Sequence, residues 1–123
     1  MKFSLNDSTG GYVITAYDEG QFKINGKPFA GSQLVFHDRK PEQLELNSIE
    51  ELSIELIEQL DLDGIDTVLI GTGKKQQFPE DEILFELQRN AVGVEIMDTA
   101  AACRTYNILL SEERMVAAVL IAI

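Results

Sequence analysis

The stretch TVLIGTG at residues 67–73 joins a short apolar run to a glycine-rich turn. Residues 67–70 are β-branched or aliphatic without interruption, which is typical of a strand that is covered on both faces. Helical patterns precede and follow this stretch in the sequence. The alternation predicts an α/β fold with βαβ units in the C-terminal two-thirds of the chain.

Before this stretch, residues 48–60 predict an amphipathic helix. Ser48-Ile49-Glu50-Glu51 has capping-box spacing, in which the Ser hydroxyl and the Glu carboxylate bind free N–H groups of the first turn. The apolar face of the helix would consist of Ile49, Leu52, Leu56, Ile57 and Leu60. Gly64 is expected to end the helix.

After the stretch, a second helix is expected to start at Pro79, because proline suits the first helical position. The acidic residues that follow suit the positive end of the helix dipole. The buried stripe of this helix would consist of Ile83, Leu84, Leu87 and Ala91. Residues 92–97 predict the next strand.

Asp98 or Thr99 is expected to cap a third helix that runs to about Leu110. Residues 115–123 form an apolar strand pattern, and we expect this strand to lie inside the sheet. The loops between strands and helices are short, which favours parallel strands joined by right-handed crossovers.

The first third of the chain predicts short strands. Residues 12–17 are rich in β-branched and aromatic residues, and residues 21–25 alternate between apolar and polar. Asn25-Gly26 suits a type I′ turn, so a hairpin back through Phe29 is expected. Residues 34–36 are a further short strand, and together these segments predict a small antiparallel meander.

Composition limits both architecture and partners. The 123 residues, with 45% hydrophobic residues, suit one domain over residues 1–123. Ten basic against twenty-one acidic residues give a net charge of −11, which argues against nucleic acid as a partner. The acidic residues concentrate at positions 41–73, where no basic residue occurs.

A single cysteine excludes an internal disulfide, and one His with one Cys makes a metal site improbable. No apolar stretch approaches the roughly 20 residues of a membrane span. Residues 1–4 lead into polar residues rather than a signal peptide. We therefore expect a cytoplasmic protein without membrane insertion and without a cofactor.

The Gly71-Thr72-Gly73 turn is the first candidate site, because ligands bind at the carboxyl ends of strands in open α/β sheets. A dinucleotide fingerprint needs a third glycine where Gln76 stands, and the phosphate-loop pattern also fails. A tight strand-to-helix turn is therefore the favoured interpretation. Lys74 and Lys75 leave room for an anionic ligand.

Cys103 is the second candidate. The positive end of the helix and the adjacent Arg104 would lower the pKa of its thiol. The three alanines at residues 100–102 instead favour a packed thiol, and structural packing is the preferred interpretation. His37 is the only possible imidazole base, and the sequence does not place it beside Cys103.

Arg104, Tyr106 and Asn107 could recognise a ligand, whereas Asp98 is expected to act as a helix cap. The resulting candidate ligand or partner pocket consists of Gly71, Thr72, Gly73, Asp98, Thr99, Cys103, Arg104, Tyr106 and Asn107. No catalytic residue and no metal ligand is assigned.

Two segments carry a family resemblance: residues 69–73, and residues 94–99 running into Ala-Cys-Arg-Thr-Tyr-Asn at 102–107. The chain resembles the uncharacterised family that includes a mitochondrial complex I assembly factor and an adipogenesis-associated protein, over about residues 12–118. The resemblance implies a three-layer α/β domain with a mixed sheet and an N-terminal β-hammerhead-like part. It also implies that no enzymatic reaction is established and that the mitochondrial branch acts as an assembly partner.

Two functions therefore stay open. The first is a non-enzymatic binding or assembly module that acts on protein partners, and the incomplete catalytic inventory favours it. The second is an enzyme or small-ligand-binding protein that uses a pocket between Gly71–Gly73 and the Cys103 helix. The oligomeric state is left open by the sequence.

Overall fold

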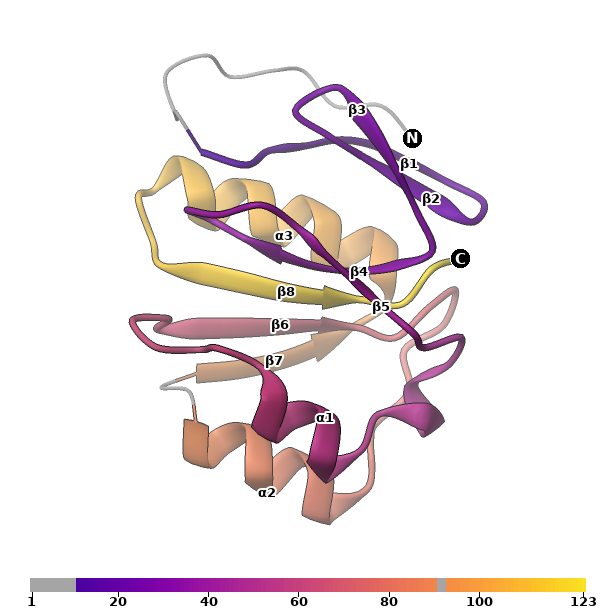
Figure 1. The fold of residues 1–123 in the computed structure, drawn as a ribbon, viewed down its shortest axis with the longest axis vertical. Coiled ribbons are helices and arrows are strands. Elements are labelled where there is room, and N and C mark those ends of the chain that lie inside the picture. Colours follow the sequence, from indigo (N-terminus) through magenta and orange to yellow (C-terminus); the bar gives the residue numbers. More distant parts are fainter. Residues whose placement is uncertain (1–10, 91–92) are drawn as a thin grey trace.

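The computed structural model describes residues 11–90 and 93–123, which form two sheets and the helices around them (Figure 1). The first sheet is the antiparallel meander that the sequence predicts. It consists of β1 (Ile14–Asp18), β2 (Gln21–Ile24) and β3 (Lys27–Ala30). Asn25 and Gly26 both have positive φ, at 52° and 82°, as a type I′ turn requires.

The second sheet is mixed and has the strand order β5-β4-β8-β6-β7. Its strands are β4 (Ser32–Phe36), β5 (Glu42–Leu44), β6 (Thr67–Gly71), β7 (Gly93–Met97) and β8 (Val116–Leu120). β6 pairs in parallel with both β7 and β8, whereas β4 pairs antiparallel with β8 and β5. The expectation that the 115–123 segment lies inside the sheet is confirmed.

Side chains that alternate along these strands build a separate core on each face of the sheet. Val68 and Ile70 pack toward α1 (Ile54–Gln59) and α2 (Asp81–Asn90). Leu69 packs instead toward α3 (Thr99–Ser111) and the meander. Figure 1 shows α1 and α2 on one side of the sheet and α3 with the meander on the other. This arrangement explains why β6 is buried along its whole length.

The prediction of a single helix over residues 48–60 is wrong. A 3₁₀ turn, η1 (Ile49–Glu51), is followed by extended backbone at Leu52 and then by α1. The Ser48 hydroxyl makes no capping bond, whereas the Ser53 hydroxyl accepts from the Leu56 N–H at 3.1 Å. The second serine therefore starts a new helix, which ends at Gln59, well before Gly64.

The second helix starts later than expected. It begins at Asp81 rather than Pro79, and the carbonyl of Glu80 accepts the first bonds, from Ile83 and Leu84. Ile83 and Leu87 are buried as predicted, while Ala91 and the expected start of the next strand at residue 92 lie outside the described residues.

The strand at residues 34–36 does not extend the meander. It belongs to β4, which pairs with β8 across a long sequence separation, and the short strand β5 beside it was not foreseen. Non-local pairing of this kind leaves no trace in the local sequence pattern.

Candidate functional site

The end of β6 and the start of α3 lie in close contact, as the candidate pocket requires. A Cβ atom added to Gly71 would lie 3.0 Å from the Cα of Thr99 and 3.1 Å from the Cβ of Ala102. Glycine at position 71 therefore allows the helix to approach the strand. The approach brings Gly71, Thr72, Gly73, Asp98 and Thr99 together.

The buried Thr99 hydroxyl connects three segments. It donates to the carbonyl oxygen of Ile121 at 2.7 Å and accepts from the Gly73 N–H at 2.8 Å. The Thr99 N–H in turn donates to the Gly73 carbonyl at 2.9 Å. Gly73 has a φ of +106°, which only glycine adopts without strain. Both backbone polar groups of Gly73 are thus bound to Thr99.

Thr72 and Asp98 also use their polar groups within the chain. The Thr72 hydroxyl donates to the Lys75 carbonyl at 2.6 Å and accepts from the Gln77 N–H at 3.1 Å. The Asp98 carboxylate accepts from the Ala101 N–H at 2.8 Å at the N-terminus of α3. The prediction that Asp98 caps the helix is confirmed.

Cys103 lies on the side of α3 that packs against the sheet and the meander, and it has no exposed surface. Burial raises the pKa of its thiol to about 12, and Arg104 offsets only part of this effect. Arg104 itself is exposed. The prediction that Cys103 is packed rather than open to solvent is confirmed.

Tyr106 and Asn107 tie α3 to the N-terminal strands. The buried Tyr106 hydroxyl lies 2.6 Å from the carbonyl oxygen of Tyr12 and 2.9 Å from that of Phe36, and it donates its proton between them. The Asn107 side chain binds the backbone of Ile14 through both its oxygen and its nitrogen. Burial raises the pKa of the Tyr106 hydroxyl above its ordinary range.

Eight of the nine candidate residues therefore fall into two groups, and the exposed Arg104 belongs to neither. Gly71, Thr72, Gly73, Asp98 and Thr99 meet where β6 leads into its loop, whereas Cys103, Tyr106 and Asn107 face the core between α3 and the meander. The hydroxyl, amide and carboxylate groups named above all bind partners within the chain. Arg104 is the member whose charged group is open to solvent.

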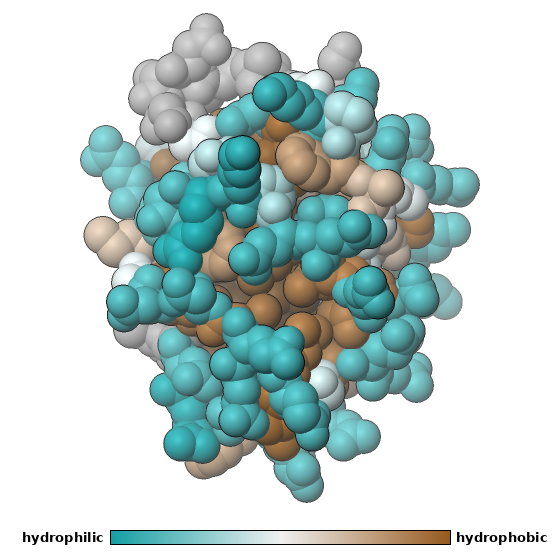
Figure 2. Space-filling view, in the orientation of Figure 1, coloured by the Kyte–Doolittle hydropathy of each residue, from teal (hydrophilic) through white to brown (hydrophobic). Residues whose placement is uncertain are grey.

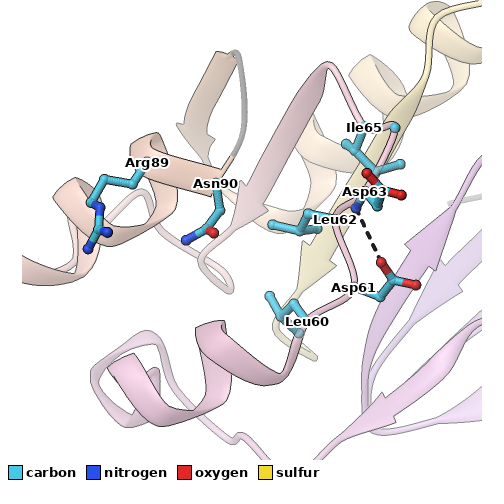
Figure 3. Close-up of a pocket in the computed structure, with 8 residues that line it drawn as sticks. Leu60, Asp61, Leu62, Asp63, Ile65, Arg89 and Asn90 are labelled. Atoms are coloured by element: carbon cyan, nitrogen blue, oxygen red, sulfur yellow. Dashed lines mark hydrogen bonds between the residues drawn. The ribbon is translucent and has the colours of Figure 1, made fainter.

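Two cavities lie elsewhere, on the α1 and α2 side of the sheet. The larger, of about 600 Å³, lies between residues 60–65 and the end of α2 (Figure 3). Arg89 and Asn90 project from α2 across from the loop, and the Asp61 carboxylate accepts from the Asp63 N–H at 3.2 Å. Arg89 pairs with Glu86 and Asp61 pairs with Arg39, so two of the three charged side chains that line this cavity, which are Asp61, Asp63 and Arg89, have ion-pair partners.

The smaller cavity, of about 340 Å³, is a groove between η1 and the segment that leads into α2. Its lining consists of Ile49, Glu50, Leu52, Phe78, Pro79, Glu80 and Ile83, and we call it the η1–α2 groove. Phe78 is 71% exposed at its edge. Figure 2 shows hydrophobic residues reaching the surface among hydrophilic ones on the face where η1 and α1 lie.

The sequence reasoning missed this groove. The available signal was Phe78, a large aromatic residue directly before Pro79 and outside every expected apolar stripe. Aromatic residues are enriched at protein contact surfaces, and Phe78 differs from a single exposed residue because it borders a groove with apolar lining.

Comparison with known proteins places this arrangement in a family. The model for proteins of unknown function DUF498/DUF598 matches residues 14–121, which covers both sheets and α3. The chain belongs to the DUF498 family. The resemblance carried by residues 69–73 and 94–107 is thereby confirmed.

Relatives of this DUF498 chain include proteins whose names state a role. A zebrafish (Danio rerio) protein named NADH dehydrogenase [ubiquinone] 1 alpha subcomplex assembly factor 3 is 34% identical over 119 residues, and the match covers 94% of this chain and 67% of that protein. A Xenopus tropicalis protein of the same name is 32% identical over 117 residues, with 94% and 63% covered. The chain thus spans about two-thirds of the length of these relatives.

The fold also matches solved structures of other proteins. A crystal structure of a Bordetella parapertussis protein superimposes with a TM-score of 0.82 at 30% identity, and the match covers 92% of this chain and 97% of that one. The α/β architecture with a mixed sheet is therefore shared with a bacterial relative of similar length. Within residues 11–90 and 93–123, no helix combines the length and apolar character that crossing a bilayer requires.

Proposed function

We propose that this DUF498 chain is a non-enzymatic binding module that helps to assemble a protein complex in the cytoplasm. The observation that carries the proposal is that polar side chains of the candidate pocket form hydrogen bonds within the chain. The hydroxyls of Thr72, Thr99 and Tyr106 and the amide of Asn107 are engaged by backbone groups of the same chain. Groups committed to holding the fold together are not free to bind or activate a substrate.

The names of the relatives support the same proposal. Proteins at 34% and 32% identity are named as assembly factors of NADH dehydrogenase, and this chain matches about two-thirds of their length. A respiratory-chain protein is therefore the first class of partner to test. Assembly requires selective contact with other proteins, for which a rigid α/β scaffold with apolar surface is sufficient.

The alternative is a small-ligand site or enzyme between Gly71–Gly73 and the Cys103 helix. The enzyme form of this alternative would require an activated thiol, because Cys103 is the candidate nucleophile of that helix. The raised pKa of Cys103 and its complete burial oppose this requirement. The binding module is therefore the favoured function.

Affinity purification of the tagged chain from its own cells, followed by mass spectrometry, tests the proposal. We expect the wild type and the Cys103→Ala variant to capture the same protein partner in near-equal amounts. An absence of any captured protein, or loss of the partner in Cys103→Ala with the fold intact by circular dichroism, would contradict an assembly role independent of the thiol.

A further inference from the structure

The η1–α2 groove combines an apolar floor with an acidic rim. We propose that it is the partner-binding surface of this chain and that it takes a basic amphipathic segment of another protein. This inference rests on the proposed function, for which it supplies a location and a partner chemistry.

The floor of the groove is fixed by the core. Ile49, Leu52 and Ile83 are buried and belong to the cluster that packs on the sheet, and Pro79 is buried beside them. Their positions are therefore set by the fold before any partner arrives, which lowers the entropic cost of binding. Phe78 adds a large apolar surface at the edge, where a partner side chain can cover it.

The charge of the rim selects the partner. Glu50 and Glu80 are exposed, and within the described ranges 11–90 and 93–123 no side chain forms an ion pair with either carboxylate. Glu51, Asp81 and Glu82 stand next to them in the sequence and are also exposed. Lys74 and Lys75 are the nearest basic residues along the chain before Phe78, and neither lines the groove.

Carboxylates without internal partners attract lysine and arginine side chains. A segment that alternates apolar and basic residues would place the apolar ones on the floor and the basic ones on the rim. An uncharged apolar segment would leave the carboxylates of the rim uncompensated, and an acidic segment would be repelled by them.

The size of the groove favours a peptide over a cofactor. Ligand pockets in proteins range over about 300–1,000 Å³, and about 340 Å³ lies at the lower limit of that range. Such a volume suits one or two apolar side chains from a longer segment. The remaining contact would come from Phe78 and the rim.

Fluorescence anisotropy with a labelled amphipathic helical peptide of leucine and lysine tests the inference on the complete chain. A peptide with glutamate in place of every lysine is the ligand control. The test variants are Phe78→Ser and the double variant Glu50→Lys/Glu80→Lys. The matched controls are Phe85→Ser, which removes a similarly exposed phenylalanine from the middle of α2, and Glu95→Lys/Glu112→Lys, which makes the same charge change elsewhere.

We expect the lysine peptide to bind the wild type, and each test variant to weaken binding by about tenfold, whereas the two controls change it by less than about twofold. Raising the salt concentration should weaken binding because exposed charges are screened. Equal weakening in test and control variants, equal binding of the glutamate peptide, or no binding at all would overturn the inference.

The cellular partner separates this inference from the proposed function. If the wild type captures a protein and Phe78→Ser releases it while Phe85→Ser retains it, the groove is the binding surface. If Phe78→Ser and Glu50→Lys/Glu80→Lys both retain the captured protein, the groove is not the partner-binding surface, whereas the proposed assembly function still holds. If the wild type captures nothing, the assembly function itself fails.

Discussion

Asn107 and Ile14 exchange two hydrogen bonds although they lie 93 residues apart in the sequence. The Asn107 Oδ1 atom accepts from the Ile14 N–H at 3.0 Å, and Nδ2 donates to the Ile14 carbonyl at 2.8 Å. A side-chain amide carries the same donor and acceptor as a peptide group, so Asn107 binds β1 as a neighbouring strand would. It thereby attaches the meander to α3.

Replacing Asn107 with alanine should destabilise the protein by about 2–4 kcal/mol, because it leaves a buried N–H and a buried carbonyl of Ile14 without partners. Arg104→Ala, at an exposed position of the same helix, should change the stability by less than about 0.5 kcal/mol. Urea unfolding followed by circular dichroism measures both. A loss below about 1 kcal/mol for Asn107→Ala would show that the pairing contributes little.

At Thr99 the hydroxyl, rather than the shape of the side chain, should determine stability. Thr99→Val keeps the shape but leaves the Gly73 N–H and the Ile121 carbonyl unbound, so we expect a loss of about 2–4 kcal/mol. Thr99→Ser keeps both bonds and removes one methyl group, at a cost of about 1 kcal/mol. If Thr99→Ser lowers the stability in thermal or urea unfolding more than Thr99→Val does, packing of the methyl group contributes more at this position than the hydrogen bonds of the hydroxyl.

The Cys103 thiol should be protected from alkylation in the native state. Its burial and its pKa of about 12 leave almost no accessible thiolate near neutral pH. Iodoacetamide labelling with mass spectrometry should give slow modification from pH 6.5 to 8.5 and rapid modification after denaturation in urea. Rapid labelling of the folded protein at pH 6.5 is the opposite outcome and would restore a reactive-thiol function.

Stability should fall as the pH rises above 9. The pKa of Cys103 is about 12 in the folded chain against an ordinary value of 9.0, so above pH 9 the unfolded chain loses the thiol proton before the folded chain does. The contribution of the thiol to the free energy of unfolding is therefore complete below pH 9 and is lost as the pH rises toward 12. The limiting slope is about 1.4 kcal/mol per pH unit. Cys103→Ala should remove this slope between pH 9 and 10 in urea unfolding, while Tyr106 adds a similar loss above pH 10. A wild-type stability that stays constant to pH 10.5 would contradict both assignments.

The Gly71–Gly73 turn should not bind nucleotides. A phosphate cradle needs free backbone N–H groups, whereas the Thr72 N–H donates to the Met97 carbonyl at 2.9 Å and the Gly73 N–H donates to Thr99. Thermal-shift measurements with NAD, NADP, ATP and GTP at millimolar concentration should show no stabilisation. A reproducible rise of several degrees with any of them would mean that the turn rearranges to accept phosphate.

Local sequence patterns predicted the elements that depend on a few adjacent residues. The apolar runs of β6 and β8, the Asn25-Gly26 turn and the Asp98 cap each follow from the chemistry of a few adjacent residues. The break between η1 and α1 did not follow, because Ser48 and Ser53 are both plausible caps in the sequence. In the fold Leu52 is extended and buried in the core, and Ser53 makes the capping bond.

The sequence places the candidate pocket residues near a strand end and a helix start, but it does not show which groups their side chains bind. A threonine, a tyrosine and an asparagine near a strand end can equally bind a ligand or distant backbone. The partners of Tyr106 and Asn107 lie in β1, in β4 and just before β1, at sequence separations of 70 to 94 residues. No pattern within α3 carries that information, and the η1–α2 groove likewise depends on two segments that meet only in the folded chain.

The central position of β8 has a consequence for synthesis. This strand follows every other described strand in the order of translation, yet it separates β4 from β6. Until β8 has emerged from the ribosome, β5 and β4 can form only a two-stranded pair, and β6 and β7 another, each with an open edge facing the place that β8 will fill. The nascent protein therefore presents two open strand edges at once, and a chaperone that shields them would be needed most until β8 has emerged.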